Sequence, residues 1–137
     1  MNAVFADTAF YVAAVNPHDE WHVAATAFVT QFSGRIVTTE FVLMEVANFF
    51  SKAAKRAAFI DLLADLKAGE ETEIVSSSAE LFGRAVDLFT RRPDKDWSLT
   101  DCTSFVTMTD RGLTDALTVD RHFEQAGFRI LLTDSKA

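Results

Sequence analysis

Residues 3–8, AVFADT, combine four apolar residues with an acid and a hydroxyl residue that follow at once. A second stretch, residues 116–120, has the sequence ALTVD and places an acid directly after a similar apolar run. A short apolar run bounded by polar residues is typical of a buried strand. Longer amphipathic segments lie between the two stretches, so we expect strands that are joined by helical crossovers. This pattern predicts an α/β fold with a mostly parallel sheet that is covered by helices on both faces.

The apolar periodicity predicts the other elements along the chain. Strands are expected at residues 3–6, 35–38, 72–76, 116–119 and 129–132. Helices are expected at residues 8–15, 18–32, 40–54, 56–67, 78–90, 98–111 and 122–125. Thr39 and Ser98 precede two of these helices and have the hydroxyl side chains that N-caps prefer.

The composition predicts one globular domain over residues 1–137. Hydrophobic residues make up 49% of the chain and include 13 phenylalanines, which is enough for a packed core. The single cysteine, Cys102, cannot form an intramolecular disulfide, and we find neither a secretory signal nor a membrane-spanning run. We therefore expect a soluble, cytoplasmic protein with no membrane partner. The net charge of −7 argues against a protein that simply coats nucleic acid.

Four acids that are distant in the sequence are candidates for one site. Asp7 and Asp120 each follow a predicted strand, so both lie at carboxyl ends of a parallel sheet. Glu45 and Asp101 lie near the starts of helices that begin at the same edge. Ligand sites in open α/β sheets form at this edge. The topology therefore predicts that the four carboxylates converge.

Convergence of these acids requires a counter-ion. Two carboxylates about 4 Å apart repel each other by roughly 4 kcal/mol at an effective dielectric constant near 20. Oxygen ligands without an accompanying set of His or Cys suit Mg²⁺ or Mn²⁺ rather than zinc. The histidines at positions 18, 22 and 122 share no metal-ligand spacing, so we expect surface or structural roles for them.

Each acid also has a purely structural interpretation, and the spacing alone leaves both open. Asp7 and Asp120 are suited to capping the helices that follow them. Asp101 lies three residues after Ser98, as in a capping box. Glu45 is the hardest to explain in this way, because its neighbours in the helix are apolar and a buried acid needs a partner.

Four motifs together carry a family resemblance. They are residues 5–9 (FADTA), 39–48 (TEFVLMEVAN), 97–102 (WSLTDC) and 117–123 (LTVDRHF), and the last continues as EQAGF to residue 128. The motifs occur in the same order in the PIN-domain nucleases and cover nearly the whole chain. The chain is most similar to the bacterial type that includes the VapC toxins of VapBC type II toxin–antitoxin pairs.

The resemblance implies a three-layer α/β/α sandwich and an Mg²⁺- or Mn²⁺-dependent endoribonuclease that leaves 5′-phosphate and 3′-hydroxyl ends. It implies RNA as substrate, a cognate antitoxin as partner, and a homodimer. The catalytic and metal-binding acids that it implies are Asp7, Glu45, Asp101 and Asp120, with Thr8 and Thr118 as accessories. Asn48 and Asp96 are further candidate accessories, and the place of Asp96 in a charged loop favours a solvated acid.

Two other functions are compatible with the same residues. The first is a catalytically inactive PIN-fold module that binds RNA or a protein partner. Against it, an active site that has lost its activity usually lacks one of its acids. The second is a phosphoryl-accepting receiver or a phosphatase with Asp7 as nucleophile. Against the second, receivers have an acid pair at the first strand. Such phosphatases usually have a second aspartate two residues on, where this chain has Ala9.

Overall fold

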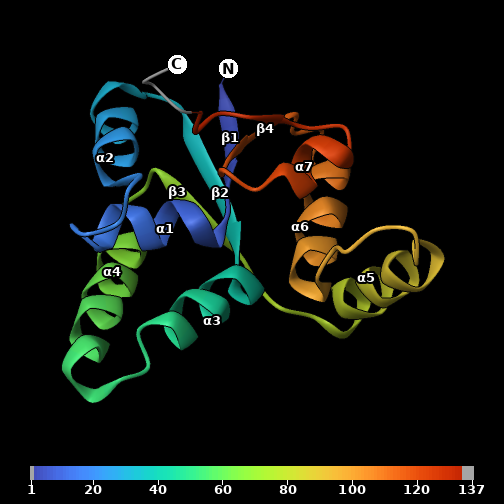
Figure 1. Ribbon diagram of the computed structural model, residues 1–137, viewed down its shortest axis with the longest axis horizontal. Coiled ribbons are helices and arrows are strands. Elements are labelled where there is room, and N and C mark those ends of the chain that lie inside the picture. The colour runs from blue at the N-terminus through green and yellow to red at the C-terminus, as the bar shows by residue number, and fades with distance from the viewer. Residues whose placement is uncertain (1, 134–137) are drawn as a thin grey trace.

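The computed structural model describes residues 2–133, which fold around one parallel sheet (Figure 1). The strands lie in the order β3-β2-β1-β4-β5. Their bounds are β1 Ala3–Ala6, β2 Arg35–Thr39, β3 Thr72–Val75, β4 Asp115–Leu117 and β5 Arg129–Ile130. The central strand β1 pairs with β2 and β4, and Phe5 is in register with both Val37 and Ala116. The expected parallel sheet is confirmed.

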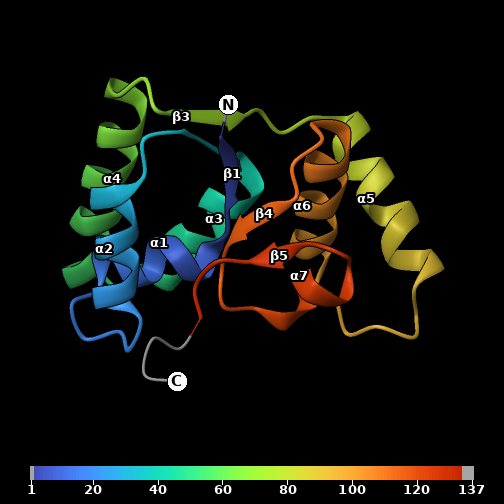
Figure 2. The same ribbon diagram turned by 90° about the horizontal axis from the view of Figure 1, so that it is seen from above.

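The helices form a layer on each side of this sheet (Figures 1 and 2). On one side lie α1 (Thr8–Val15), α2 (His22–Gln31) and α4 (Arg56–Ala68), and on the other lie α5 (Ala79–Arg91), α6 (Leu99–Asp110) and α7 (Arg121–Gln125). Helix α3 (Glu40–Phe49) lies at the carboxyl edge of the sheet, where it contacts α1, α4 and α6. A short 3₁₀ turn, Ala53–Lys55, precedes α4. The predicted α/β/α sandwich is therefore confirmed.

The strand order places a crevice between β1 and β4. From β1 the chain moves outward to β2 and β3, and it then crosses back to β4 and β5 on the other side of β1. Right-handed crossovers consequently put the first helices on one face and the later helices on the opposite face. The carboxyl ends of β1 and β4 are the switch point at which such sheets bind ligands.

The core joins the sheet to the later helices through aromatic side chains. Phe5 on β1 and Phe123 on α7 are fully buried, with ring centroids 6.3 Å apart. Phe105 on α6 packs edge-on against Phe123 at 4.9 Å. Val4, Phe5 and Ala6 are all buried, as expected for the central strand of a sheet that is covered on both faces. This packing fixes α6 and α7 relative to the end of β1.

Four predicted boundaries are wrong by two or more residues. The helix predicted at 18–32 begins only at His22, because residues 16–21 form turns in which the Asp19 carboxylate accepts the Trp21 N–H at 2.8 Å. The helix predicted at 40–54 ends at Phe49, and the side chain of the next residue, Phe50, is buried in the core. The strand predicted at 116–119 ends at Leu117, and the strand predicted at 129–132 ends at Ile130.

The two predicted hydroxyl caps are present. The Thr39 hydroxyl accepts the Val42 N–H at 3.1 Å, and the Ser98 hydroxyl accepts the Asp101 N–H at 2.9 Å. Cys102 is buried in the core. No helix within residues 2–133 is long and apolar enough to cross a lipid bilayer.

Candidate active site

A cleft of about 600 Å³ opens at the carboxyl edge of the sheet. Its walls come from the ends of β1 and β4, the first turns of α1, α6 and α7, one side of α3, and the loop before α2. All four of the predicted acids line it, namely Asp7, Glu45, Asp101 and Asp120. Segments that are up to 113 residues apart in the sequence, from Asp7 to Asp120, therefore meet at one site.

Asp7 lies at the bottom of this cleft. It follows β1 directly, and its side chain is buried, with the residue only 4% exposed. The Thr118 hydroxyl donates a hydrogen bond to Asp7 Oδ2 at 3.0 Å. Asp7 is the N-cap residue of α1, but its side chain makes no capping hydrogen bond, so the purely structural interpretation fails here.

The charge of Asp7 is poorly solvated in the metal-free protein. The pKa of Asp7 is raised to about 7, chiefly by burial and in part by the charges of Asp101 and Glu45. Hydrogen bonds from the Thr8 backbone and the Thr118 hydroxyl lower the pKa but do not offset burial. A buried carboxylate with these neighbours is stabilised by a cation.

Asp101 both caps a helix and lines the cleft. Its Oδ2 accepts the Ser98 N–H at 3.1 Å, which completes the capping box with the Ser98 hydroxyl. The residue is also only 7% exposed and lines the cleft. Burial raises the pKa of Asp101, and the charge of Asp120 raises it further. The capping box thus holds an acid in the site.

The sequence predicted that Asp120 directly follows its strand, and this prediction is wrong. Two residues separate it from the end of β4, and its N–H donates to the Thr118 hydroxyl at 3.0 Å. Asp120 Oδ1 accepts the His122 N–H at 2.9 Å and so caps α7. Thr118 therefore bonds to Asp7 and positions Asp120, which gives the predicted accessory a structural basis.

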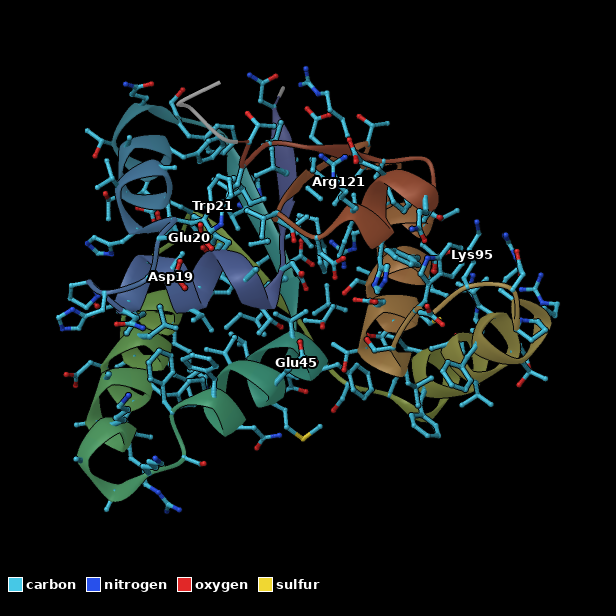
Figure 3. The ribbon with its side chains drawn as sticks, viewed as in Figure 1. Asp19, Glu20, Trp21, Glu45, Lys95 and Arg121 are labelled. Carbon is cyan, nitrogen blue, oxygen red and sulfur yellow. The ribbon has the colours of Figure 1, made fainter. Side chains whose placement is uncertain are left out.

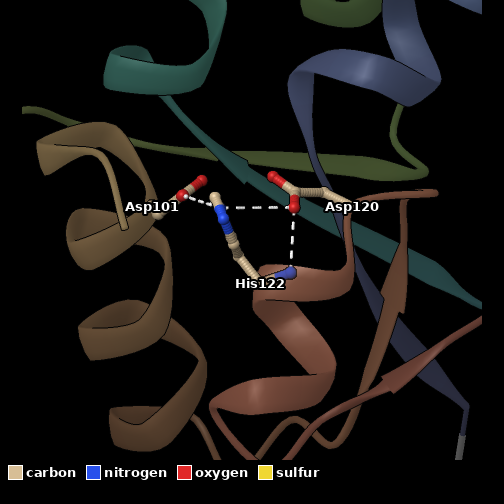
Figure 4. Close-up of side chains that lie close together, drawn as sticks. All are labelled: Asp101, Asp120 and His122. Carbon is tan, nitrogen blue, oxygen red and sulfur yellow. Dashed lines mark hydrogen bonds and ion pairs between the residues drawn. The ribbon is translucent and has the colours of Figure 1, made fainter. Parts of the chain in front are cut away.

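His122 lies in the same cluster, which the spacing of the histidines in the sequence did not predict (Figure 4). Its Nδ1 lies 3.0 Å from Asp101 Oδ2 and 3.4 Å from Asp120 Oδ1. One potential ligand atom from each of these three residues lies within 4.8 Å of the other two. The signal in the sequence was its position two residues after a candidate ligand, in the first turn of the same short helix.

Glu45 faces the cleft from the opposite side, on α3 (Figure 3). The residue is exposed, so the prediction of a buried acid that needs a partner is wrong. The Thr8 hydroxyl donates a hydrogen bond to Glu45 Oε1, which ties α1 to α3 at the rim. Thr8 therefore orients the glutamate, in keeping with an accessory role.

The two further candidate accessories, Asp96 and Asn48, differ in whether they reach the cleft. Asp96 is exposed, as expected of a loop acid, but it lines the cleft. Asn48 is exposed on α3 and is not among the residues that line the cleft. The structure thus brings Asp96, but not Asn48, to the four acids.

The donor set fits a hard divalent cation. It consists of carboxylates, with one imidazole beside two of them. Within residues 2–133, neither Asp101 Oδ1 nor Asp120 Oδ2 has a hydrogen-bond donor, so each carboxylate retains an oxygen for a ligand. Oxygen-rich sites of this kind suit Mg²⁺ and Mn²⁺.

Comparison with known proteins identifies the family. The PIN-domain model matches residues 4–129. The chain belongs to the PIN-domain family. PIN-domain nucleases act with divalent metal ions, and the acidic cluster is present in this PIN domain. The alternative of a receiver or an aspartate-nucleophile phosphatase is therefore wrong.

The PIN domain is similar to a VapC endonuclease. It is 26% identical to the 23S rRNA-specific endonuclease VapC20 of two Mycobacterium tuberculosis strains, over 91% of this chain and 95% of the relative. The crystal structure of M. tuberculosis VapC20, a Sarcin-Ricin loop cleaving toxin, superposes with a TM-score of 0.83 at 25% identity and the same coverage. This PIN domain is thus a homologue of a VapC endoribonuclease, as the motifs predicted.

A chain in a solved toxin–antitoxin complex also has this fold. VapBC2 from Rickettsia felis, bound to a DNA fragment from its promoter, matches with a TM-score of 0.69 at 17% identity, over 97% of this chain and all of that chain. At this identity the match supports the fold.

Proposed function

We propose that this PIN-domain protein is an endoribonuclease of the VapC type that hydrolyses RNA phosphodiesters with Mg²⁺ or Mn²⁺. The observation that carries the proposal is the convergence of four distant acids in one cleft around the buried carboxylate of Asp7. Similarity to a VapC endonuclease over 91% of the chain supports the same activity.

Each acid has a distinct place in the proposed site. Asp7 and Asp101, the two most buried of the four, would hold the cation from the floor and from the start of α6. Asp120 and Glu45 would complete or flank this site from α7 and α3, directly or through water. The hydrogen bonds from Thr118 and Thr8 keep Asp7 and Glu45 in position.

The chemistry requires a cation together with fixed carboxylates. A bound divalent ion lowers the pKa of a water and stabilises charge on phosphoryl oxygens. The residues of the chain position the carboxylates before RNA binds, so little reorganisation is needed. The capping box of α6 holds Asp101, the hydroxyls of Thr8 and Thr118 hold Glu45 and Asp7, and Asp120 is held by its own cap of α7. His122 restrains Asp101 and Asp120 together, as groups behind metal ligands commonly do.

The proposed substrate class is structured ribosomal RNA, by similarity to VapC20. To test this, purified protein is incubated with deproteinised 23S rRNA and Mg²⁺ or Mn²⁺, and new RNA ends are sequenced. We expect discrete new 5′-phosphate ends that disappear with EDTA and with Asp120→Asn, but not with Asp61→Asn, an exposed acid on α4. Mn²⁺ binding without any new RNA ends would instead support an inactive PIN-fold binding module.

A protein partner is part of the proposal. Large apolar side chains are exposed on α2 and α4, among them Val23, Val29 and Ile60. Apolar surface of this kind commonly marks protein interfaces. An antitoxin and a second copy of the chain are the two partners expected of a cytoplasmic VapC-type toxin.

A further inference from the structure

The two sides of the acidic cleft differ in chemical character. Asp101, Asp120 and His122 line the side formed by α6 and α7. The side formed by α1, the loop before α2 and α3 also has acids, but it presents most of the large apolar side chains of the cleft, namely Val12, Trp21 and Phe49. A site that only held a cation would need no apolar wall. The wall therefore indicates that part of a ligand lies against it.

Trp21 is held at this wall by its local structure. The Asp19 carboxylate accepts the Trp21 N–H at 2.8 Å, and the Trp21 carbonyl accepts the Ala25 N–H at 2.9 Å. The His22 ring lies 2.7 Å from the Ala13 carbonyl and so fixes the start of α2 against α1. The backbone that carries the indole is thus fixed before any ligand binds.

The two tryptophans of the chain have different environments. Trp97 is 6% exposed, and its indole N–H donates to Gln125 at 3.1 Å. Trp21 is only partly buried, and its indole N–H has no acceptor within residues 2–133. Phe49, the other aromatic residue of the wall, is 54% exposed. Two accessible aromatic rings therefore line the same cleft.

Charge determines which part of RNA can lie against this wall. Asp19 and Glu20 line the cleft beside Trp21 and would repel phosphates. Lys95 and Arg121 lie outside the cleft lining, on the side of α6 and α7 (Figure 3), and Arg121 pairs with Glu124 at 2.8 Å. An uncharged flat group is therefore the part of RNA that is compatible with the acidic, aromatic side. In RNA that flat group is a base.

We propose that Trp21, together with Phe49, binds an unpaired nucleobase beside the scissile phosphate. This inference rests on the proposed ribonuclease function. A paired base in a duplex has both faces stacked, whereas a base in a loop or single strand can turn out onto an aromatic ring. The wall thus selects for unpaired RNA at the cleavage position.

Steady-state cleavage kinetics test this role. The substrate is a single-stranded oligoribonucleotide that spans the position cut in rRNA. We expect Trp21→Leu to raise KM by roughly 5- to 100-fold with kcat nearly unchanged, the range expected for loss of one base–aromatic stack. Trp21→Phe should retain a KM close to that of the native protein. Phe82→Leu, which alters an exposed aromatic residue on α5 outside the cleft, is the matched control.

Fluorescence provides a second measurement that does not depend on the stability of the Leu variant. In an Asp101→Asn background, binding of the oligoribonucleotide should quench the emission of Trp21. The same titration with Trp21→Phe should leave the emission of the buried Trp97 unchanged. An unaltered KM for a folded Trp21→Leu protein, or no quenching on binding, overturns the inference. If no RNA is cut by the native protein, the proposed function itself fails.

Discussion

The substitution Asp7→Asn should stabilise the metal-free protein while it abolishes cleavage. Asp7 has a pKa of about 7 in the folded chain, well above its ordinary value of 3.8, because burial disfavours its charged form. Its contribution to stability is therefore fully present below about pH 4 and is lost as the pH rises through 7. At pH 8 the folded protein holds an ionised, buried carboxylate that the unfolded chain would solvate.

The magnitude follows from the two pKa values. A difference between 3.8 and about 7 corresponds to about 4 kcal/mol of unfolding free energy at pH 8. Asparagine removes this penalty and keeps an acceptor for the Thr118 hydroxyl, but its amide N–H groups need partners. We therefore expect a net stabilisation of about 2 to 4 kcal/mol. At pH 5 the same linkage predicts that Asp7→Asn stabilises the protein by less than half as much as at pH 8.

Urea unfolding in EDTA at pH 8 and pH 5 measures this directly, with Asp61→Asn as the exposed control. Saturating Mn²⁺ should then stabilise the native protein by about 3 kcal/mol at a hundred times its Kd, but not Asp7→Asn. A metal-free Asp7→Asn protein that is less stable than the native protein at pH 8 would refute the reasoning. It would mean that Asp7 is already stabilised as an anion by the protein alone.

Three further predictions concern the residues around the acids. Thr118→Val should cost about 1 to 3 kcal/mol, measured by thermal unfolding, because it removes the donor to Asp7; an unchanged midpoint would contradict it. Ser98→Ala should cost about 1 kcal/mol in urea unfolding, through loss of the capping box with Asp101; a neutral effect would show that α6 needs no cap. His122→Ala should weaken Mn²⁺ binding about 10- to 100-fold by calorimetry, because Asp101 and Asp120 lose their shared contact; unchanged affinity would exclude a supporting role.

Much of the fold could be predicted because its signals are local. The apolar run of β1 ends at Asp7, and the strand bounds at residues 3–6 were predicted correctly. Alternation of strands and helices restricts the crossovers to one hand, so a parallel sheet with helices on both faces followed from the order of elements. The four acids could be placed at one edge by the same argument.

The errors arose where tertiary contacts override the local pattern. Nothing in residues 40–54 signals that the side chain of Phe50 turns into the core and ends α3 at Phe49. Glu45 has an apolar neighbour on each side in the sequence, but Met44 is 60% exposed while Val46 is fully buried. Sequence neighbours on a helix point in different directions, so they do not report the burial of the residue between them.

Contacts between helix ends were also hidden in the sequence. His122 joins the site because the first turns of α6 and α7 meet, and no spacing rule connects residue 122 with residue 101. Trp21 falls inside the helix predicted at residues 18–32, but the turn at Asp19 places it in the lining of the cleft. The positions of His122 and Trp21 in the site both depend on how elements far apart in the chain pack together.

The central claim is that the acidic cleft is a metal site for RNA hydrolysis. The most direct measurement is the initial rate of RNA cleavage as a function of Mn²⁺ concentration for the native protein, Asp101→Asn and Asp61→Asn. We predict saturable Mn²⁺-dependent cleavage by the native protein and Asp61→Asn, and a rate at least 100-fold lower for Asp101→Asn, in line with loss of one electrostatic group from a preorganised site. Equal rates for the three proteins, or cleavage that persists in EDTA, would contradict the account.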